Sequence, residues 1–249
     1  DVLILVAVRL KSTRLSRKAM ADLCGKPLII RLTERVRQAE IPSEVVWCTS
    51  NNCQDDPLEQ LAVEQGIAVY RGSELDVMSR FIEVANEWNA STVVRVTGDN
   101  PLTDPSMMDV MIEAHLEQNA EYTFTEDLPV GTRPEIIDVD MLKRCHKLLQ
   151  DPDSSEYMTW MLNRPDQFKT LKINACLPEI KRPEISLSVD TEEDLEIIRA
   201  VYENFQGDPP DLHEIISWID SNPNGSKMTN NKISKSTDDN FVNWKLKGE

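Results

Sequence analysis

Apolar positions along the first half of the chain follow two different periods. Residues 2–8 (VLILVAV) form an unbroken apolar run, which is typical of a strand buried on both faces of a sheet. Similar short runs predict strands at 44–50, 67–70, 91–97 and 121–125. Apolar residues at helical spacing predict helices at 27–39, 56–66, 74–88 and 104–117. This alternation predicts an α/β domain with a mostly parallel sheet and helices on its faces.

The regular alternation ends near residue 126. The segment PVGTRPEIIDVDML predicts a loop, a short strand and the start of a helix, and residues 154–163 predict a further helix. Residues 168–175 and 185–189 have the composition of strands, which belong either to a small second sheet or to an extension at the edge of the main sheet. We therefore expect a small α+β protrusion over about 126–185.

The composition changes after two predicted amphipathic helices at 192–205 and 211–220. The following stretch, SNPNGSKMTNNKISKSTDDN, is polar and poor in apolar residues, which is typical of a linker or a disordered segment. Apolar residues return only in FVNWKLK, which is compatible with a short docked strand or turn. We expect one domain over residues 1–220 and a polar tail over 221–249.

Composition and charge argue against a nucleic-acid partner, a membrane partner and a zinc site. The 249 residues include 27 Lys and Arg against 43 Asp and Glu, a net charge of −16. This balance disfavours a nucleic-acid partner, which would need a broad basic face. The run at 2–8 is too short to cross a bilayer, so we expect no membrane partner. The five cysteines include no C-x-x-C pair, which favours reduced thiols in a cytoplasmic protein over a zinc site.

The densest positive charge of this acidic chain follows directly after the first predicted strand. The run RLKSTRLSRKAM contains Arg9, Lys11, Arg14, Arg17 and Lys18. Ligands of open parallel sheets bind beyond the carboxyl ends of the strands, so a loop at this place can surround a polyphosphate. The alternative is a solvated surface loop, because charged runs are usually solvated.

Two carboxylates lie at other strand ends. Asp99 follows the strand in VVRVTGDNPLTDP, where it can ligate Mg²⁺ bound to a triphosphate, because Mg²⁺ takes one or two carboxylates together with phosphate oxygens. The alternative role, a turn or a helix cap, suits Asp104 better, since Asp104 and Pro105 open the helix predicted at 104–117. In SLSVDTEEDLEII, Asp190 also precedes a predicted helix and can be simply its cap.

The segment RLKSTRLSRKAMADLCGKPLI resembles the opening motif of the CMP-sugar synthetase group, R-x-x-S-x-R-L-P-x-K-x-L-x-x-x-x-G-K-P-L. That group contains the acylneuraminate and 3-deoxy-manno-octulosonate cytidylyltransferases, and the chain is most similar to its branch of spore-coat polysaccharide biosynthesis proteins of the F type. Ser16 replaces the usual proline, and the resemblance covers about residues 2–205. The matching positions are Arg9, Ser12, Arg14, Leu15, Lys18, Gly25, Lys26, Pro27 and Leu28.

The resemblance implies the Rossmann-like fold of nucleotide-diphospho-sugar transferases and a CTP-dependent nucleotidyltransferase activity. A hydroxyl of a sugar, expected to be acidic, would attack the α-phosphorus of CTP and yield a CMP-sugar and pyrophosphate. The resemblance also implies Mg²⁺ held by Asp99 and Asp190, with Arg14 and Lys18 at the β- and γ-phosphates. It further leads us to expect a homodimer.

Two weaker matches add candidate residues. YRGSELDVMSRF resembles the branch's G-S-x-x-D-V-L-x-R-F stretch near the nucleotide and the sugar, and it offers Asp76 and Arg80 beside Arg9 and Ser12 of the loop. A capped helix with apolar core residues explains most of the same pattern. PVGTRPEIIDVDML resembles P-D-G-L-D-V-E-V-F-x-x-x-x-L, of which Glu135 is one matching residue.

Departures from the family pattern leave other functions open. Ser186 stands where the branch often has arginine, and Tyr157 where relatives have a histidine-containing stretch, so acceptor recognition transfers least. One alternative is a glycosyltransferase of the same architecture, although the complete basic loop favours a triphosphate ligand. Another is a catalytically weak nucleotide-binding module. The isolated histidines are expected to be structural; they are His115, His146 and His213.

Overall fold

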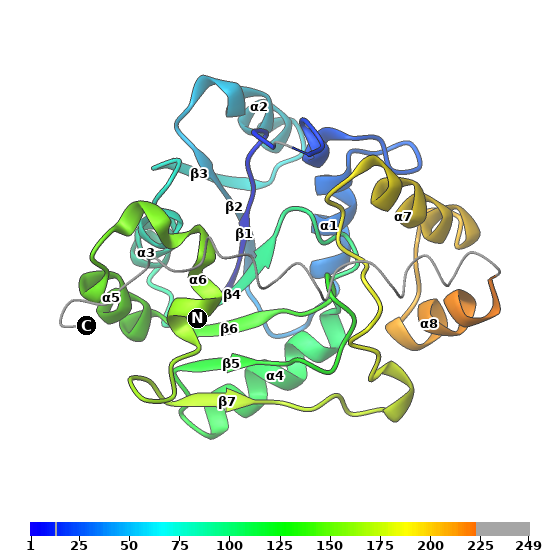
Figure 1. Cartoon of the computed structure of the whole chain (residues 1–249). Helices are drawn as coiled ribbons and strands as arrows, with labels where there is room; N and C mark the ends of the chain where they lie inside the picture. Colours follow the sequence, from blue (N-terminus) through cyan, green and yellow to red (C-terminus); the bar gives the residue numbers. More distant parts are fainter. Residues whose placement is uncertain (13, 223–249) are drawn as a thin grey trace.

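The computed structural model describes residues 1–12 and 14–222, which are organised around one seven-stranded sheet (Figure 1). The strand order is β3-β2-β1-β4-β6-β5-β7, and only β6 runs antiparallel to its neighbours. The predicted mostly parallel α/β sheet is therefore confirmed. The strands are β1 (Val2–Ala7), β2 (Glu44–Ser50), β3 (Ala68–Gly72), β4 (Thr92–Thr97), β5 (Tyr122–Phe124), β6 (Glu135–Asp138) and β7 (Thr170–Lys172).

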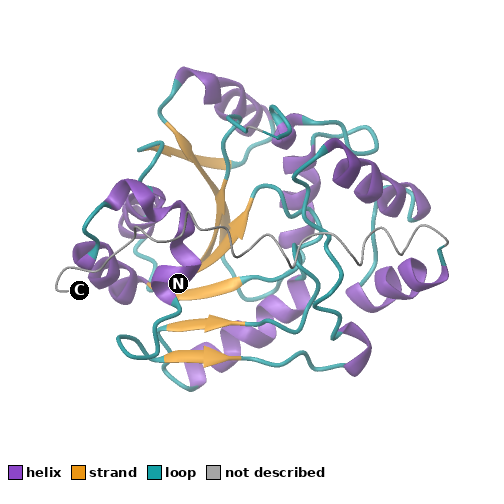
Figure 2. Cartoon of the chain, in the orientation of Figure 1, coloured by secondary structure: helices purple, strands orange, loops and turns teal. Residues whose placement is uncertain are grey.

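Helices cover both faces of the sheet (Figure 2). One face packs against α1 (Leu28–Val36), α2 (Asp56–Glu64), α4 (Pro105–Glu117), α7 (Glu192–Asn204) and α8 (Leu212–Ser221). The other face packs against α3 (Val77–Glu87), α5 (Val139–Leu148) and α6 (Met158–Leu162). Short 3-10 turns complete the described structure: η1 (Lys18–Met20), η2 (Cys53–Asp55), η3 (Pro152–Tyr157) and η4 (Pro178–Ile180).

The central strand shows why its sequence is an unbroken apolar run. Ile4 and Val6 of β1 pack into the core on the α1 side, whereas Leu3 and Leu5 pack into the core on the α3 side. Successive side chains of a strand point to opposite faces, so a strand with helices on both faces needs apolar residues at every position. No helix in the described part of the chain is long and apolar enough to cross a membrane.

Residues 126–185 contribute to the main sheet. β6 and β7 both belong to it, so the edge-extension interpretation of 168–175 is confirmed and the second-sheet alternative is wrong. Residues 185–189 form no strand, and their one bridge joins Ser186 to Val130. The predicted tail over 221–249 lies outside the described residues except for its first two positions.

Candidate active site

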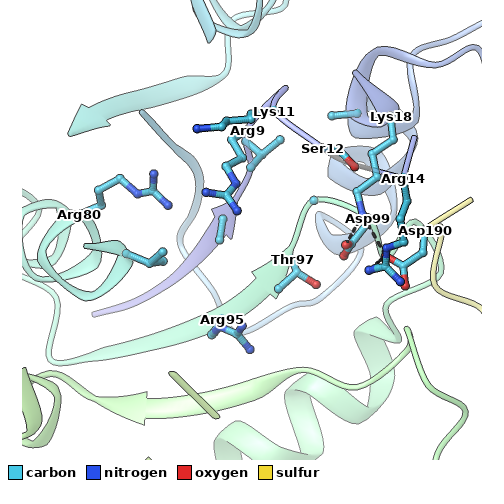
Figure 3. Close-up of a pocket in the computed structure, with 15 residues that line it drawn as sticks. Arg9, Lys11, Ser12, Arg14, Lys18, Arg80, Arg95, Thr97, Asp99 and Asp190 are labelled. Carbon is cyan, nitrogen blue, oxygen red and sulfur yellow. Dashed lines mark hydrogen bonds and ion pairs between the residues drawn. The ribbon is translucent and has the colours of Figure 1, made fainter. Parts of the chain in front are cut away.

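A cavity of about 310 Å³ opens at the carboxyl ends of β1 and β4, where ligands of parallel sheets bind (Figure 3). It lies between the loop that follows β1 and the first turns of α3. Its lining includes seven of the eight residues that the sequence nominated for the site: Arg9, Ser12, Arg14, Lys18, Arg80, Asp99 and Asp190.

The ends of β1 and β4 approach each other closely because residue 98 has no side chain. The backbone N–H of Gly98 donates to the carbonyl of Ala7 at 2.9 Å. A Cβ at this position would lie 2.8 Å from Cγ2 of Val8, which is closer than packed atoms can come. The glycine therefore lets the end of β4 place Asp99 beside the loop that follows β1.

Backbone hydrogen bonds bring Asp190 to Asp99 from a distant part of the sequence. The N–H of Val189 donates to the carbonyl of Asp99 at 2.9 Å, and the N–H of Leu187 donates to the carbonyl of Val130 at 2.7 Å. The cap of α7 is Thr191, whose hydroxyl accepts from the backbone of Asp194. Asp190 is therefore not the cap, and it lines the cavity.

The two carboxylates converge on one ammonium group. Nζ of Lys18 lies 2.7 Å from Oδ2 of Asp99 and 3.2 Å from Oδ1 of Asp190, and it donates to the carbonyl of Val189 at 3.0 Å (Figure 3). Nη2 of Arg14 lies 3.2 Å from the same Oδ1 of Asp190. A positive charge thus occupies the point where both carboxylates meet, as a metal cation would.

The cavity is strongly cationic although the whole chain is acidic. Its two carboxylates, Asp99 and Asp190, face six cationic side chains. This excess of local positive charge suits a polyanionic ligand, and it explains how a chain of net charge −16 can hold one. The six are Arg9, Lys11, Arg14, Lys18, Arg80 and Arg95.

Asp76 is the nominated residue that does not line the cavity. Its carboxylate caps α3 by accepting from the N–H of Ser79 at 2.9 Å, and it also accepts from the hydroxyl of Ser155 at 3.1 Å. Nε2 of His146 lies 2.6 Å from its other oxygen. The capped-helix alternative therefore accounts for Asp76, and His146 has a structural contact as expected.

Arg80 is a buried cation with few partners. Its side chain is 2% exposed, and Nη1 donates to the carbonyl of Ser73 at 3.1 Å. Nε has no hydrogen-bond partner among the described residues, and none of their carboxylates lies within ion-pair distance of the guanidinium. Burial lowers the pKa of Arg80, and the neighbouring charge of Arg9 lowers it as well. Such a group is stabilised by an anion that enters the cavity.

Arg95 is a site residue that sequence reasoning missed. It lies within β4, and its Nη1 donates to Glu135 of β6 and, at 3.2 Å, to the hydroxyl of Thr159. Burial is the largest single influence and works to lower the pKa of Arg95, but the charge and the hydrogen bond of Glu135, together with Tyr122 and Asp99, raise the pKa overall. The available signal was an arginine inside the otherwise apolar run VVRVT.

The positions that depart from the family pattern have different outcomes. Ser186 does not line the cavity, and its buried hydroxyl has no hydrogen-bond partner among the described residues. The side chain of Tyr157 lies outside what the structure describes. His115 is buried against Thr123, and burial lowers its pKa to about 4, which fits the expected structural role.

Comparisons with known proteins agree with this geometry. A cytidylyltransferase family model matches residues 3–206. The spore coat polysaccharide biosynthesis protein SpsF of Bacillus subtilis is 34% identical over 235 residues, which cover 91% of this chain and 97% of that protein. A cytidylyltransferase structure from Leptospira borgpetersenii is 25% identical with a TM-score of 0.82, covering 93% of this chain and 97% of its own.

The fold is shared more widely. A structure of CMP:2-keto-3-deoxy-manno-octonic acid synthetase complexed with CTP superposes with a TM-score of 0.64 at 19% identity, covering 82% of this chain and 99% of its own. At that identity the likeness shows a common fold. Together with the match over residues 3–206, these findings show that the chain belongs to the cytidylyltransferase family.

Proposed function

We propose that this protein transfers the cytidylyl group of CTP to a hydroxyl of an acidic sugar, giving a CMP-sugar and pyrophosphate. The observation that carries the proposal is the convergence of Asp99 and Asp190 on Lys18, beneath a basic loop, in a chain of the cytidylyltransferase family. SpsF is named for polysaccharide biosynthesis, which is a process that consumes activated sugars.

The residues of the chain act by positioning and by electrostatic stabilisation. Arg9, Arg14 and Lys18 of the loop bind the anionic phosphates and stabilise the charge that develops on the leaving pyrophosphate. The attacking sugar oxygen and the leaving oxygen lie roughly in line at the α-phosphorus. The cavity holds both substrates in that arrangement, which reduces the entropic part of the barrier.

The donor set fits Mg²⁺ bound together with the nucleotide. Asp99 and Asp190 supply hard carboxylate oxygens that already surround one cation, the ammonium of Lys18. The described residues include no cluster of three or more His, Cys, Asp or Glu side chains suited to a metal, so the remaining ligands would come from phosphate and water. When bound, Mg²⁺ would supply positive charge at the α-phosphate. Lys18 would then leave the carboxylates, because like charges repel, and face phosphate oxygens.

The test is pyrophosphate release from each of the four nucleoside triphosphates with a panel of sugar acids, with Mg²⁺ and with excess chelator. We expect release only with CTP, a sugar acid and Mg²⁺ together. Release that persists in chelator would contradict the metal role. CTP binding without release would favour the weak binding module, and sugar transfer from a sugar nucleotide would favour the glycosyltransferase. The homodimer stays a prediction, which sedimentation of the full chain tests.

A further inference from the structure

Arg95 occupies a position where the pattern of the sheet predicts an apolar side chain. Val93 of the same strand packs into the core on the α3 side, and Arg95 and Thr97 follow on that same face at two-residue spacing. Arg95 nevertheless carries a charge into this layer and lines the cavity (Figure 3). A guanidinium placed so deep costs desolvation free energy, so it needs partners that offset that cost.

Glu135 is the partner that holds Arg95 in place. The two residues are register partners on the antiparallel strands β4 and β6. The side chain of Glu135 is 11% exposed, and its carboxylate accepts from Arg95, from the hydroxyl of Tyr122 and, at 2.8 Å, from the hydroxyl of Thr159. Donors from β4, β5 and α6 therefore fix this carboxylate, which in turn fixes the guanidinium.

These contacts use only one corner of the guanidinium. The hydrogen bonds of Arg95 to Glu135 and to Thr159 both come from Nη1. Neither Nε nor Nη2 donates to any residue within the described ranges. Nε is buried, so Nη2 is the nitrogen that can donate a charge-assisted hydrogen bond to a carboxylate in the cavity. Nη2 is thus oriented by Glu135 and has no acceptor among the described residues.

The position of Arg95 points to the sugar and not to the leaving phosphates. The basic loop follows β1, which pairs with β4 on one side, whereas Glu135 belongs to β6 on the other side. An in-line transfer places the attacking group opposite the leaving group. Pyrophosphate at the loop cations Arg14 and Lys18 therefore puts the acceptor toward β6.

We infer that Arg95, positioned by Glu135, binds the carboxylate of the acidic sugar and selects acidic over neutral acceptors. The inference rests on the proposed function, because it assigns the acceptor half of that reaction. A neutral side chain at this position would lose the charge-assisted hydrogen bond to the carboxylate. The nucleotide half of the cavity would keep its own contacts.

The experiment compares Arg95→Met with the wild type in pyrophosphate release from CTP and Mg²⁺, using 3-deoxy-manno-octulosonate, N-acetylneuraminate and their uncharged carboxamides. We expect KM for the acid to rise about 10- to 100-fold, the scale of a lost charge-assisted pair. We expect the preference for acid over amide to disappear, and the Kd for CTP from calorimetry to stay within about threefold.

Two further variants keep the test interpretable. Arg144→Met removes an exposed arginine that is paired with Glu121 outside the cavity, and it should change neither KM nor the acid preference. Arg95→Lys keeps the charge but lacks the planar guanidinium that can contact Glu135 and the sugar carboxylate through different nitrogens, so it should raise KM by a smaller factor. If Arg95→Met does not fold, Arg95→Lys carries the test.

The outcomes separate this inference from the proposed function. A wild type that turns over sugar acids, with an Arg95→Met variant whose KM and acid preference are unchanged, overturns the inference alone. An equal loss of CTP affinity would place Arg95 at the nucleotide and overturn it as well. A wild type that accepts only neutral sugars, or that releases no pyrophosphate with any acceptor, overturns both.

Discussion

The two ends of the cavity hold their charges in different ways. At the loop end, Lys18 is bound by Asp99 and Asp190, two carboxylates that Mg²⁺ would take over from Lys18 in the proposed reaction. At the β6 end, Arg95 is bound by Glu135, which is itself held by side chains from neighbouring elements. The cation at the loop end can therefore change its partners, whereas the cation at the β6 end is held in a fixed position.

Burial does not explain this difference. The side chain of Lys18 is 16% exposed and that of Arg95 is 15% exposed. The difference lies in the chemistry of the cations and in what holds their partners. An ammonium on a flexible stem can move between carboxylates and phosphates, whereas a planar guanidinium keeps a fixed fork. The comparison teaches that this site combines a cation that can exchange partners with a preorganised one.

The largest effect on turnover is expected from substitution of Asp99 at the loop end of the cavity. Asp99→Asn keeps the shape of the side chain but removes one of the two negative charges, so pyrophosphate release should fall about 10²-fold or more. Asp140→Asn is the matched control, because Asp140 has a side chain 84% exposed and lies outside the cavity. Turnover of Asp99→Asn close to that of the control, with both melting temperatures unchanged, would refute the metal role.

A smaller effect is expected from substitution of Lys18, and it concerns the affinity for nucleotides. Lys18→Ala should weaken CTP about 10- to 100-fold, because a charge-assisted contact to the β- and γ-phosphates contributes about 1.5–3 kcal/mol. CMP lacks those phosphates, so its affinity should stay within about threefold. Calorimetric titration of both nucleotides with Mg²⁺ measures the difference. Equal losses of affinity for CTP and CMP would place Lys18 at the α-phosphate or the base. No loss for either nucleotide would indicate that the loop is a solvated surface loop.

The smallest expected effect concerns the backbone that joins the two carboxylate segments. Gly131 has φ +89°, and a Cβ there would lie 2.5 Å from the backbone N of Ser188, which leads into Asp190. Gly131→Ala should lower the free energy of unfolding by about 2 kcal/mol or more, from backbone strain and overpacking together. Thermal melting measures this as a loss of several degrees, and pyrophosphate release should fall with it.

Gly66→Ala is the matched control for that substitution. Gly66 also has a positive φ, +62°, but nothing lies within 4 Å of a Cβ built there. Gly66→Ala should therefore lower the free energy of unfolding by about 1 kcal/mol, from backbone strain alone, and should leave turnover unchanged. If both variants melted at the same temperature, close packing at Gly131 would not be what holds Asp190 near Asp99.

Much of the fold could be predicted because its signals are local. The apolar run at β1 and the helical periods at α1 and α3 directly reflect burial on one or two faces. The caps of several helices, such as Asp104 for α4, are also local, since a side chain there serves the N–H groups of the next turn. The strand predicted at 185–189 is wrong, because the apolar residues of this segment are buried while its backbone forms only the single bridge between Ser186 and Val130.

The residues of the candidate site also differ in whether local sequence signals mark them. Arg14, Lys18 and Asp99 could be nominated because loop position, strand ends and a long motif all mark them in the sequence. Asp76 was nominated for the nucleotide and sugar, but it caps α3 and does not line the cavity; a capping aspartate and a ligand-binding one follow the same sequence pattern until their neighbours are known. Arg95 was missed because its partner Glu135 comes from an antiparallel strand whose register no local pattern reveals.

The sequence by itself determined the order of strands and helices, the positive loop after β1 and the family to which these belong, because periodicity and contiguous motifs depend on neighbouring residues. The tertiary structure decided which charges meet. Asp190 reaches Asp99 through the hydrogen bond of Val189, and Glu135 reaches Arg95 through the pairing of β6 with β4. Such contacts depend on register and packing between distant segments, where energies of a few kcal/mol are decided by the whole fold.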